Sequence, residues 1–246
     1  MSFSPSFVDS SELRAHLLDP GYGVLAAGEL CALLGVELSQ LKALEPSWHD
    51  LPPDRYLLDG GRYRRRRHAC FIVDGDRIER ISGRAHWQPL EYNALHGGLE
   101  RWFEPIDQSI CDCRAWQQMI SKLAAVASSV KGDRRWFVEA HQFRIDTTDG
   151  IGRPTPEGAH RDGVDLVAVI LVSRHGIKGG ETRVFDADGP AGSRFTLSEP
   201  WSLLLLDDAL VIHESTPIQP VDPAGEGWRD TLVITFRQGG FQGPPG

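Results

Sequence analysis

The sequence predicts a mainly β protein with flanking helices, an α+β arrangement, and three observations support that fold class. From residue 135 to residue 237, about seven short strand-like runs follow one another, with Gly, Pro and Asp turns between them. Helix-like spacing of apolar residues is confined to the first half of the chain. The 246 residues, 41% of them hydrophobic, are enough for one substantial core. Consecutive strands without intervening helices indicate a sandwich, a jelly roll or a barrel.

A single domain is expected over residues 1–246, because β proteins of this length commonly form one core. Within it, residues 1–134 are expected to supply helical and hairpin support, and residues 135–237 to form the β core. Residues 238–246, "QGGFQGPPG", are rich in Gly and Pro, and we expect them to be a flexible tail.

The first elements along the chain are helical. Residues 10–45 carry leucines at helical spacing after two serines that can act as N-caps. Residues 46–61 are rich in Pro and Asp and are expected to be a loop. Residues 62–81 contain two β-rich runs joined by Asp74 and Gly75, a pair typical of a hairpin turn. A helix is therefore expected first and a β-hairpin after the loop.

A second helix is predicted for residues 114–131, where apolar side chains recur on one stripe and Gly132 supplies a stop. Packing of that stripe against a sheet is its expected role. The strands that follow alternate or are continuously apolar, and turn residues separate them. They are predicted at 135–145, 164–172, 181–188, 193–197, 201–208, 210–216 and 229–237.

Charge and composition limit the classes of partner. A net charge of −8 and a pI near 5.6 disfavour nucleic acid, whose binding needs a basic surface. No segment approaches eighteen apolar residues and the N-terminus lacks the pattern of an export signal, so we expect no membrane association and a cytoplasmic location. The four cysteines follow no zinc-finger spacing and are expected to be reduced thiols. The sequence leaves the oligomeric state open.

The run of basic residues from Arg62 to Arg67 has two interpretations. In a strand, alternate residues face opposite sides, and the acidic chain offers many partners, so a solvated or ion-paired strand is favoured. The alternative is a guide for anionic small molecules.

The segment "TPEGAHRDGVD" places His160 and Asp162 two residues apart just before an apolar run. Residues i and i+2 of an extended segment project to the same side, so both side chains can reach one ion. A second histidine, His213, ends the run "LLLLDDALVIHE". Two imidazoles and one carboxylate form the donor set that holds Fe(II) with open coordination positions, and the same set also suits catalytic zinc. We therefore expect His160, Asp162 and His213 to be both the metal ligands and the catalytic centre.

The last predicted strand, "RDTLVITFR", carries an unusual polar face. Alternation puts Arg229, Thr231 and Arg237 on one face, together with Val233 and Thr235. An Arg there can hold a carboxylate with two parallel hydrogen bonds, and Thr adds a hydroxyl donor. This face suggests an anionic co-substrate near the metal.

Together these motifs resemble the Fe(II)/2-oxoglutarate dioxygenases, specifically the bacterial group of free amino acid hydroxylases that includes L-isoleucine hydroxylase. The resemblance covers about residues 52–237 and is carried by "PTPEGAHRDGVDLVAVILV", "KGGETRVFD", "LLLLDDALVIHESTPIQP" and "RDTLVITF". It implies a double-stranded β-helix core, that is, a jelly roll of the cupin type. The cofactors it implies are Fe(II), 2-oxoglutarate as co-substrate, and O2.

The resemblance also implies residue roles and a reaction. His160, Asp162 and His213 match the iron ligands, and Arg229 with Thr231 matches the pair that binds the distal carboxylate of 2-oxoglutarate. The sixteen residues between His213 and Arg229 exceed the commonest spacing, so Arg237 stays an alternative to Arg229. The implied reaction hydroxylates an unactivated C–H bond of a free L-amino acid, or a cyclic one such as pipecolate, and releases succinate and CO2.

The expected small-molecule partner is this amino acid, and several residues are candidates for binding it. Gln142 and Arg144 share one face of the strand at 135–145 and could meet 2-oxoglutarate or a substrate carboxylate. Glu157 lies three residues before His160 and could accept a substrate ammonium. Trp87 and Tyr92, in "HWQPLEYN", could form a pocket wall. Each residue has an ordinary structural alternative, such as a strand hydrogen bond or a loop ion pair.

Three other functions are weighed against this one. A zinc hydrolase would use the same ligands, but the chain has no His-Glu-x-x-His helix, and hydrolysis gives the Arg and Thr face no role. A non-catalytic, cupin-like module would bind a small ligand without turnover. Within the dioxygenases, the substrate could be a modified or carrier-tethered amino acid, and fold analogy alone does not choose between substrates.

Overall fold

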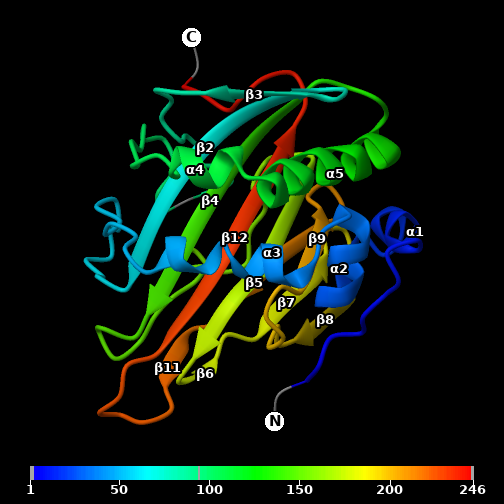
Figure 1. Cartoon of the computed structure of the whole chain (residues 1–246). Coiled ribbons are helices and arrows are strands. Elements are labelled where there is room, and N and C mark those ends of the chain that lie inside the picture. The colour runs from blue at the N-terminus through cyan, green and yellow to red at the C-terminus, as the bar shows by residue number, and fades with distance from the viewer. Residues whose placement is uncertain (1–2, 94, 245–246) are drawn as a thin grey trace.

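A seven-stranded antiparallel sheet is the frame of the computed structural model, which describes residues 3–93 and 95–244 (Figure 1). The long central strands come from the hairpin region and from the second half of the chain, so residues distant in sequence share one surface. In spatial order the strands are β1 (Tyr22–Leu25), β9 (Leu203–Asp207), β5 (Leu166–His175), β12 (Trp228–Arg237), β4 (Trp136–Asp146), β2 (Arg64–Asp74) and β3 (Arg77–Ile81).

Smaller sheets lie against one part of this large sheet. One contains β10 (Val211–Ser215), β7 (Thr182–Asp186) and β8 (Gly192–Phe195), and the other pairs β11 (Ile218–Pro220) with β6 (Ile177–Gly179). An apolar cluster joins the three-stranded sheet to the large one, with Val167 and Leu171 on one side and Val184 and Val211 on the other. This two-sheet packing confirms the predicted jelly-roll class.

Helices cover the other face of the large sheet (Figure 1). The long helix α5 buries Trp116, Met119 and Leu123 in the core that also contains Val138 and Leu232 of the sheet. Because helices seal this face, the opposite face is left for a site. The helices are α1 (Leu13–Leu18), α2 (Ala27–Leu34), α3 (Leu38–Lys42), the 3-10 turn η1 (Glu45–Trp48), α4 (Gln108–Asp112) and α5 (Arg114–Lys131).

Strand β12 illustrates how alternation separates core from site. Leu232, Ile234 and Phe236 are fully buried in the helix-covered core. The residues that alternate with them along the strand, Arg229, Thr231, Val233, Thr235 and Arg237, line a pocket on the opposite face. The two-residue period of the strand therefore assigns each side chain to one environment, as the sequence predicted.

The region expected to be helical at residues 10–45 contains a strand as well. Strand β1 pairs with Leu203–Leu206 of β9 and interrupts the helices. Gly23 in this strand faces α1 so closely that a Cβ atom would lie 2.7 Å from Leu13 Cδ1. The leucine spacing of the flanking helices hides this four-residue strand, because pairing with a distant partner is invisible to a local pattern. The three-residue strands β6 and β11 were missed for the same reason.

The segment expected to be a flexible tail makes contacts near the pocket as far as it is described. The Phe241 ring packs edge-on against Phe137 with centroids 5.1 Å apart. The Gln242 amide donates to the main-chain carbonyls of Asp162 and Gly163 at 3.0 and 2.8 Å. Both residues line the pocket. Across the described residues, every helix is too short or too polar to span a bilayer.

Candidate metal centre and its pocket

Two histidines distant in sequence are joined by their backbones. His160 lies in the loop before β5, and His213 lies on β10. Each donates its backbone N–H to the carbonyl of the other at 3.0 Å, which forms an isolated antiparallel bridge. The ring centroids are 4.7 Å apart. The bridge therefore sets the relative position of the two imidazoles.

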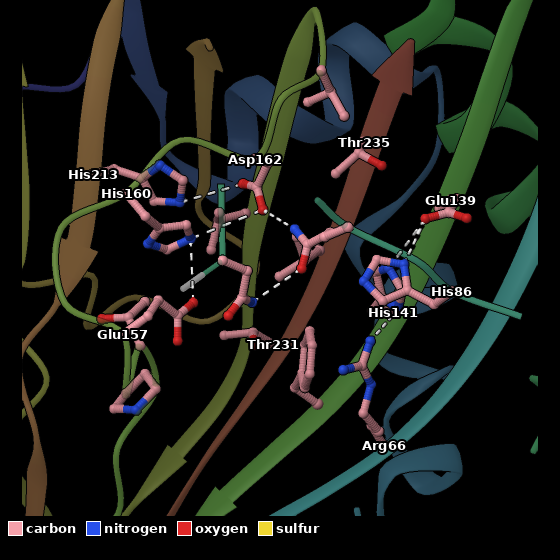
Figure 2. Close-up of a pocket in the computed structure, with 18 of the residues that line it drawn as sticks. Arg66, His86, Glu139, His141, Glu157, His160, Asp162, His213, Thr231 and Thr235 are labelled. Atoms are coloured by element: carbon pink, nitrogen blue, oxygen red, sulfur yellow. Dashed lines mark hydrogen bonds and ion pairs between the residues drawn. The ribbon is translucent and has the colours of Figure 1, made fainter. Parts of the chain in front are cut away.

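Asp162 completes a group of three possible metal ligands (Figure 2). Its Oδ1 lies 3.9 Å from His160 Nε2, and its Oδ2 lies 3.8 Å from His213 Nε2. Bonds from a transition metal to imidazole nitrogen or carboxylate oxygen are about 2.0–2.2 Å long. One ion can therefore reach all three side chains.

The hydrogen bond of His160 prepares it for this role. Its Nδ1 lies 3.0 Å from the carbonyl oxygen of Gly158, which only accepts, so Nδ1 carries the proton and Nε2 offers its lone pair. Burial lowers the pKa of His160, but the Asp162 and Glu157 carboxylates outweigh it and the net shift is upward. Burial lowers the pKa of His213 to about 3, so this imidazole is neutral near pH 7.

Asp208 holds the loop that carries Asp162. Its carboxylate accepts the backbone N–H groups of Asp162, Gly163 and Val164 at 2.7–3.1 Å. Gly163 has φ +74, a left-handed conformation that few other residues adopt without strain. The carboxylate and the glycine together define the turn of this loop.

The metal-ligand group opens into a pocket whose floor is the polar face of β12. Arg229 is 3% exposed, and its Nε and Nη2 have no hydrogen-bond partner among the described residues. Burial, then the charge of Arg174, lowers its pKa to about 10. A buried guanidinium without an anion is unfavourable, so this arrangement suits an incoming carboxylate. Thr231 and Arg237 also line the pocket, but Arg237 Nη1 already donates to the Gly240 carbonyl at 2.5 Å.

A polar chain connects Asp162 to a second buried guanidinium. The Gln88 amide Nε2 donates to Asp162 Oδ1 at 3.1 Å. The Gln88 Oε1 accepts from Arg101 Nη2 at 2.8 Å and from Asn93 Nδ2 at 3.1 Å. The stretch "HWQPLEYN" was predicted to contribute to a pocket wall, and it contributes His86, Gln88 and Asn93.

Glu157 stands beside the metal-ligand group. Its Oε1 is 3.5 Å from His160 Nε2, and its buried Oε2 has no hydrogen-bond partner in the part of the chain that the structure describes. Glu157 also lines the pocket, so an unpaired carboxylate oxygen is available there.

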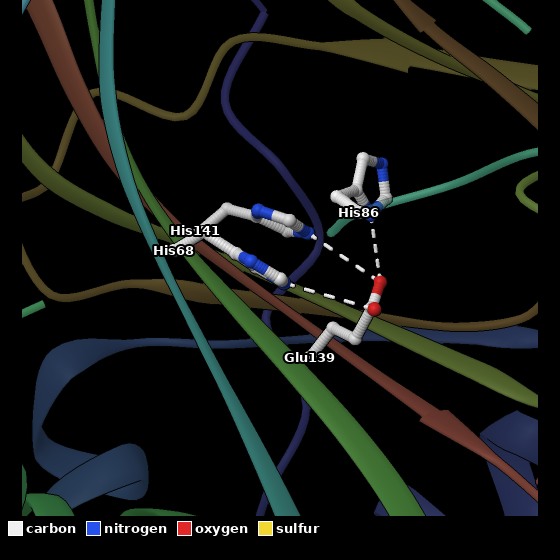
Figure 3. A group of neighbouring side chains, drawn as sticks. All are labelled: His68, His86, Glu139 and His141. Atoms are coloured by element: carbon white, nitrogen blue, oxygen red, sulfur yellow. Dashed lines mark hydrogen bonds and ion pairs between the residues drawn. The ribbon is translucent and has the colours of Figure 1, made fainter. Parts of the chain in front are cut away.

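A second cluster of histidines and a carboxylate lies on the opposite wall of the pocket (Figure 2). Glu139 Oε2 is 2.7 Å from His86 Nδ1 and 4.0 Å from His141 Nε2, and Glu139 Oε1 is 3.7 Å from His68 Nε2 (Figure 3). We call His68, His86, Glu139 and His141 the histidine hub. Burial alone raises the pKa of Glu139, but His86 and His68 hold it below its ordinary value.

The protons of the histidine hub point toward Glu139. Arg66 Nη2 lies 2.7 Å from His141 Nδ1, and because a guanidinium only donates, Nδ1 accepts and Nε2 carries the proton. His86 Nδ1 donates to the ionised Glu139. The facing nitrogens of His86 and His141 therefore offer hydrogens, not lone pairs. His86 forms a hydrogen bond to Glu139, and His68 and His141 face the same carboxylate at 3.7 and 4.0 Å.

Four of the residues predicted from sequence do not reach the pocket. Gln142 and Arg144 share one face of β4, as expected, but the pocket is lined by His141 and Phe143 of the other face. Gln142 instead donates to Ser47 Oγ at 2.7 Å. Arg144 forms two 2.7 Å hydrogen bonds to Asp230. Trp87 and Tyr92 are also not among the pocket-lining residues.

A jelly roll that presents two imidazoles and a carboxylate, opposite a buried arginine without a partner, defines the class of metal- and 2-oxo-acid-dependent oxygenases. The chain belongs to the 2OG-Fe dioxygenase family, whose model matches residues 45–235. Enzymes of this family use Fe(II), 2-oxoglutarate and O2, so this protein is an oxidoreductase. The two imidazoles and the carboxylate suit Fe(II), and the buried guanidinium of Arg229 suits a carboxylate of 2-oxoglutarate.

Three solved structures share the fold of this chain. A bsmA homolog from Methylobium petroleophilum PM1 is 49% identical, with a TM-score of 0.92 and 98% of each chain covered. IDO from Bacillus thuringiensis is 18% identical, with a TM-score of 0.77 over 98% of this chain and 100% of that one. The Fe(II)/(alpha)ketoglutarate-dependent dioxygenase TqaL is 20% identical, with a TM-score of 0.72 over 93% and 87%. No curated protein matches the chain.

Proposed function

We propose that this protein hydroxylates an unactivated C–H bond of a free L-amino acid, or of a cyclic amino acid such as pipecolate. The family fixes the oxidant system as Fe(II), 2-oxoglutarate and O2. The observation that carries the amino acid assignment is the unpaired oxygen of Glu157 beside the metal-ligand group, which would accept a substrate ammonium. The likeness of its motifs to the free amino acid hydroxylases supports the same substrate class.

His160, Asp162 and His213 would hold the iron. Their donor atoms suit Fe(II), and three ligands on one side leave the remaining coordination positions for 2-oxoglutarate and O2. Arg229 would bind the distal carboxylate of 2-oxoglutarate, with Thr231 as a hydroxyl donor. Arg229 is favoured over Arg237 because its Nε and Nη2 lack partners, whereas Arg237 is bonded to Gly240.

In the overall reaction O2 would be the oxidant, the C–H bond and 2-oxoglutarate would each give up two electrons, and bound iron would allow O2 to react. One 2-oxoglutarate, one O2 and one C–H bond give succinate, CO2 and one C–OH. The contribution of the chain is to position the reactants and to exclude water. Asp208 fixes the loop of Asp162, the Gly158 carbonyl fixes the tautomer of His160, and Phe241 and Gln242 border the pocket.

The test is succinate formation from 2-oxoglutarate with Fe(II), ascorbate and O2, across the twenty amino acids plus pipecolate, ornithine and citrulline. Mass spectrometry would search for products heavier by one oxygen atom. Coupled formation of succinate and a hydroxylated amino acid is expected. The variant Glu157→Gln keeps the shape of the side chain but removes the charge, so we expect a higher KM for the amino acid.

Two results would contradict the proposal. Succinate without any hydroxylated free amino acid would transfer the assignment to modified or carrier-tethered substrates. An unchanged KM in Glu157→Gln would remove this residue from ammonium recognition while leaving the reaction class in place.

A further inference from the structure

Arg101 is a buried cation that has no carboxylate in direct contact among the residues that the structure describes. Its side chain lies at the pocket and is 2% exposed, and its backbone is fixed by paired 2.9 Å hydrogen bonds to His86. Its Nη2 donates to the neutral amide of Gln88, and its Nε has no partner. Within residues 3–93 and 95–244, no carboxylate lies within ion-pair distance of this guanidinium. Burying an unpaired charge is costly, which indicates that an anion from outside the chain completes this site.

Arg229 is also a buried guanidinium with unpaired nitrogen atoms among the described residues, and it lines the same pocket. In the proposed function its anionic partner is 2-oxoglutarate. The co-substrate 2-oxoglutarate has two carboxylates, of which one would bind the iron and the other Arg229. Neither is left over for Arg101. The second unpaired guanidinium therefore requires an anionic group on the substrate.

The surroundings of Arg101 add to the positive charge of this wall. Arg64 and Arg66 also line the pocket, and Asp54 is the carboxylate close to them, at 2.7 and 3.7 Å. Arg66 is further fixed between the rings of Phe103 and Phe143, with its Cζ 3.8 and 4.4 Å from the two ring centroids.

Burial and the charge of Arg64 lower the pKa of Arg101 to about 10, and the carboxylates of Asp54, Glu157 and Glu139 oppose this shift. Among the described residues, these carboxylates lie beyond ion-pair distance of Arg101, so a ligand carboxylate could still contact the guanidinium directly.

The position of Arg101 suits an amino acid in particular. Gln88 bonds both Arg101 and Asp162, so the guanidinium is two hydrogen bonds from a metal ligand. Glu157, the proposed ammonium acceptor, lines the same pocket. An α-amino acid carries its ammonium and its carboxylate on the same carbon atom, and the pocket offers a group of opposite charge for each, Glu157 and Arg101.

We propose that Arg101 binds the α-carboxylate of the substrate and thereby selects free amino acids over those whose carboxyl is amidated, esterified or tethered. This inference rests on the proposed function and assigns a residue to its substrate specificity. Arg66, held by His141 and the two phenyl rings, borders the same subsite.

The experiment compares an amino acid with its primary amide. The probes are the amino acid that gives the most product in the panel, or the tightest binder if none reacts, and its amide. Binding to the anaerobic Fe(II) and 2-oxoglutarate complex is measured by calorimetry. Wild-type protein is expected to prefer the acid by roughly 10- to 100-fold, the value of a charge-assisted hydrogen bond.

In Arg101→Gln this preference should disappear, because affinity for the acid falls while affinity for the amide does not. Arg101→Lys should restore part of it. The matched control is Arg65→Gln, whose side chain is on strand β2 beside Arg64 and Arg66 but is 39% exposed and paired with Asp146. Fe(II) and 2-oxoglutarate affinities report whether the variants keep an intact site.

The inference is overturned if Arg101→Gln keeps the full preference for the acid, if it weakens acid and amide equally, or if wild-type protein shows no preference. Failure of the proposed function gives a different result. In that case no amino acid is hydroxylated, yet a carboxylate-dependent affinity that is lost in Arg101→Gln would still support the anion subsite.

Discussion

The two walls of the pocket carry nearly the same residue types, yet they are arranged for different purposes. On one wall, the carboxylate oxygens of Asp162 lie 3.9 and 3.8 Å from the Nε2 atoms of His160 and His213. On the other, His86 donates to Glu139 at 2.7 Å and His141 accepts from Arg66 at 2.7 Å. In the histidine hub the nitrogens of His86 and His141 that face Glu139 carry protons, whereas in the first group Nε2 of His160 offers a lone pair to an ion.

The comparison shows that the hydrogen-bond partner of Nδ1 decides whether Nε2 of the same imidazole carries a proton or offers a lone pair to a metal. A carbonyl at Nδ1, as in His160, forces the proton there and frees Nε2 for a metal. A guanidinium at Nδ1, as in His141, forces the proton onto Nε2. Residue composition alone would have assigned a metal to both walls.

The largest expected effect is a difference in Fe(II) affinity between variants of the two pocket walls. His213→Ala should weaken Fe(II) binding by more than about 100-fold, which exceeds the ~10- to 100-fold cost of losing only a hydrogen-bond partner of a ligand. Turnover should be lost while the fold, followed by circular dichroism, persists. The matched variant His141→Ala, on the opposite wall, should keep the metal affinity within a few-fold. Equal losses in the two variants would break the comparison.

The next effect concerns the floor between the walls. Arg229→Gln should raise the Kd for 2-oxoglutarate roughly 10- to 100-fold, because a charge-assisted pair of hydrogen bonds is lost. Arg237→Gln should change it by a much smaller factor, since Arg237 is bonded to Gly240. Calorimetry on the Fe(II)-loaded protein measures both. If the two variants exchange these results, Arg237 is the co-substrate residue.

A smaller effect is expected on the stability of the protein when the carboxylate of the histidine hub is replaced. Glu139→Gln removes the charge that His68 and His86 face, and we expect a loss of about 1–3 kcal/mol in unfolding free energy. The iron content should stay at one per chain. Two metal ions per wild-type chain, falling to one in this variant, would show that the hub is itself a metal site.

The smallest effect is a dependence of stability on pH. Burial lowers the pKa of His86 to about 3 in the folded protein, whereas an unfolded histidine titrates near ~6.5. Between these values the unfolded chain binds the extra proton, so stability falls as the pH decreases, by at most about 1.4 kcal/mol per pH unit for one group. His141 shifts in the same direction. Glu139 adds its own loss only below its unfolded pKa.

Urea unfolding at pH 5 to 7.5 measures this slope. The variant His86→Asn should have a shallower slope by about one proton, because it removes one of the groups that titrate only after unfolding. An identical slope in the variant would mean that His86 is already protonated in the folded protein.

Much of the fold could be predicted because long elements repeat their pattern. The helix at 114–131 and the strand at 229–237 were placed nearly residue by residue, since burial recurs along them at the helical or strand period. The strand at Tyr22–Leu25 was not, because its pairing with β9 is a long-range contact. Local spacing cannot report a partner about 180 residues away.

The site was predictable where its residues form motifs. His160 and Asp162 share an i, i+2 spacing, and the polar face of β12 could be read from alternation. Arg101 and Gln88 come from an irregular region, and only the fold brings them to Asp162. On β4 alternation gave two faces correctly, but both faces are polar. The sequence therefore could not say that His141, not Gln142, meets the pocket.

The backbone bridge between His160 and His213 has a consequence for how the protein acquires its metal. Because two main-chain hydrogen bonds join these residues, the chain brings the imidazoles together when it folds, before any ion arrives. The conformational entropy of ordering the ligands is lost at folding and not at metal uptake. Iron can then leave and return without unfolding the domain. Supply of the metal thus sets how much of the protein is active, and not how much of it is folded.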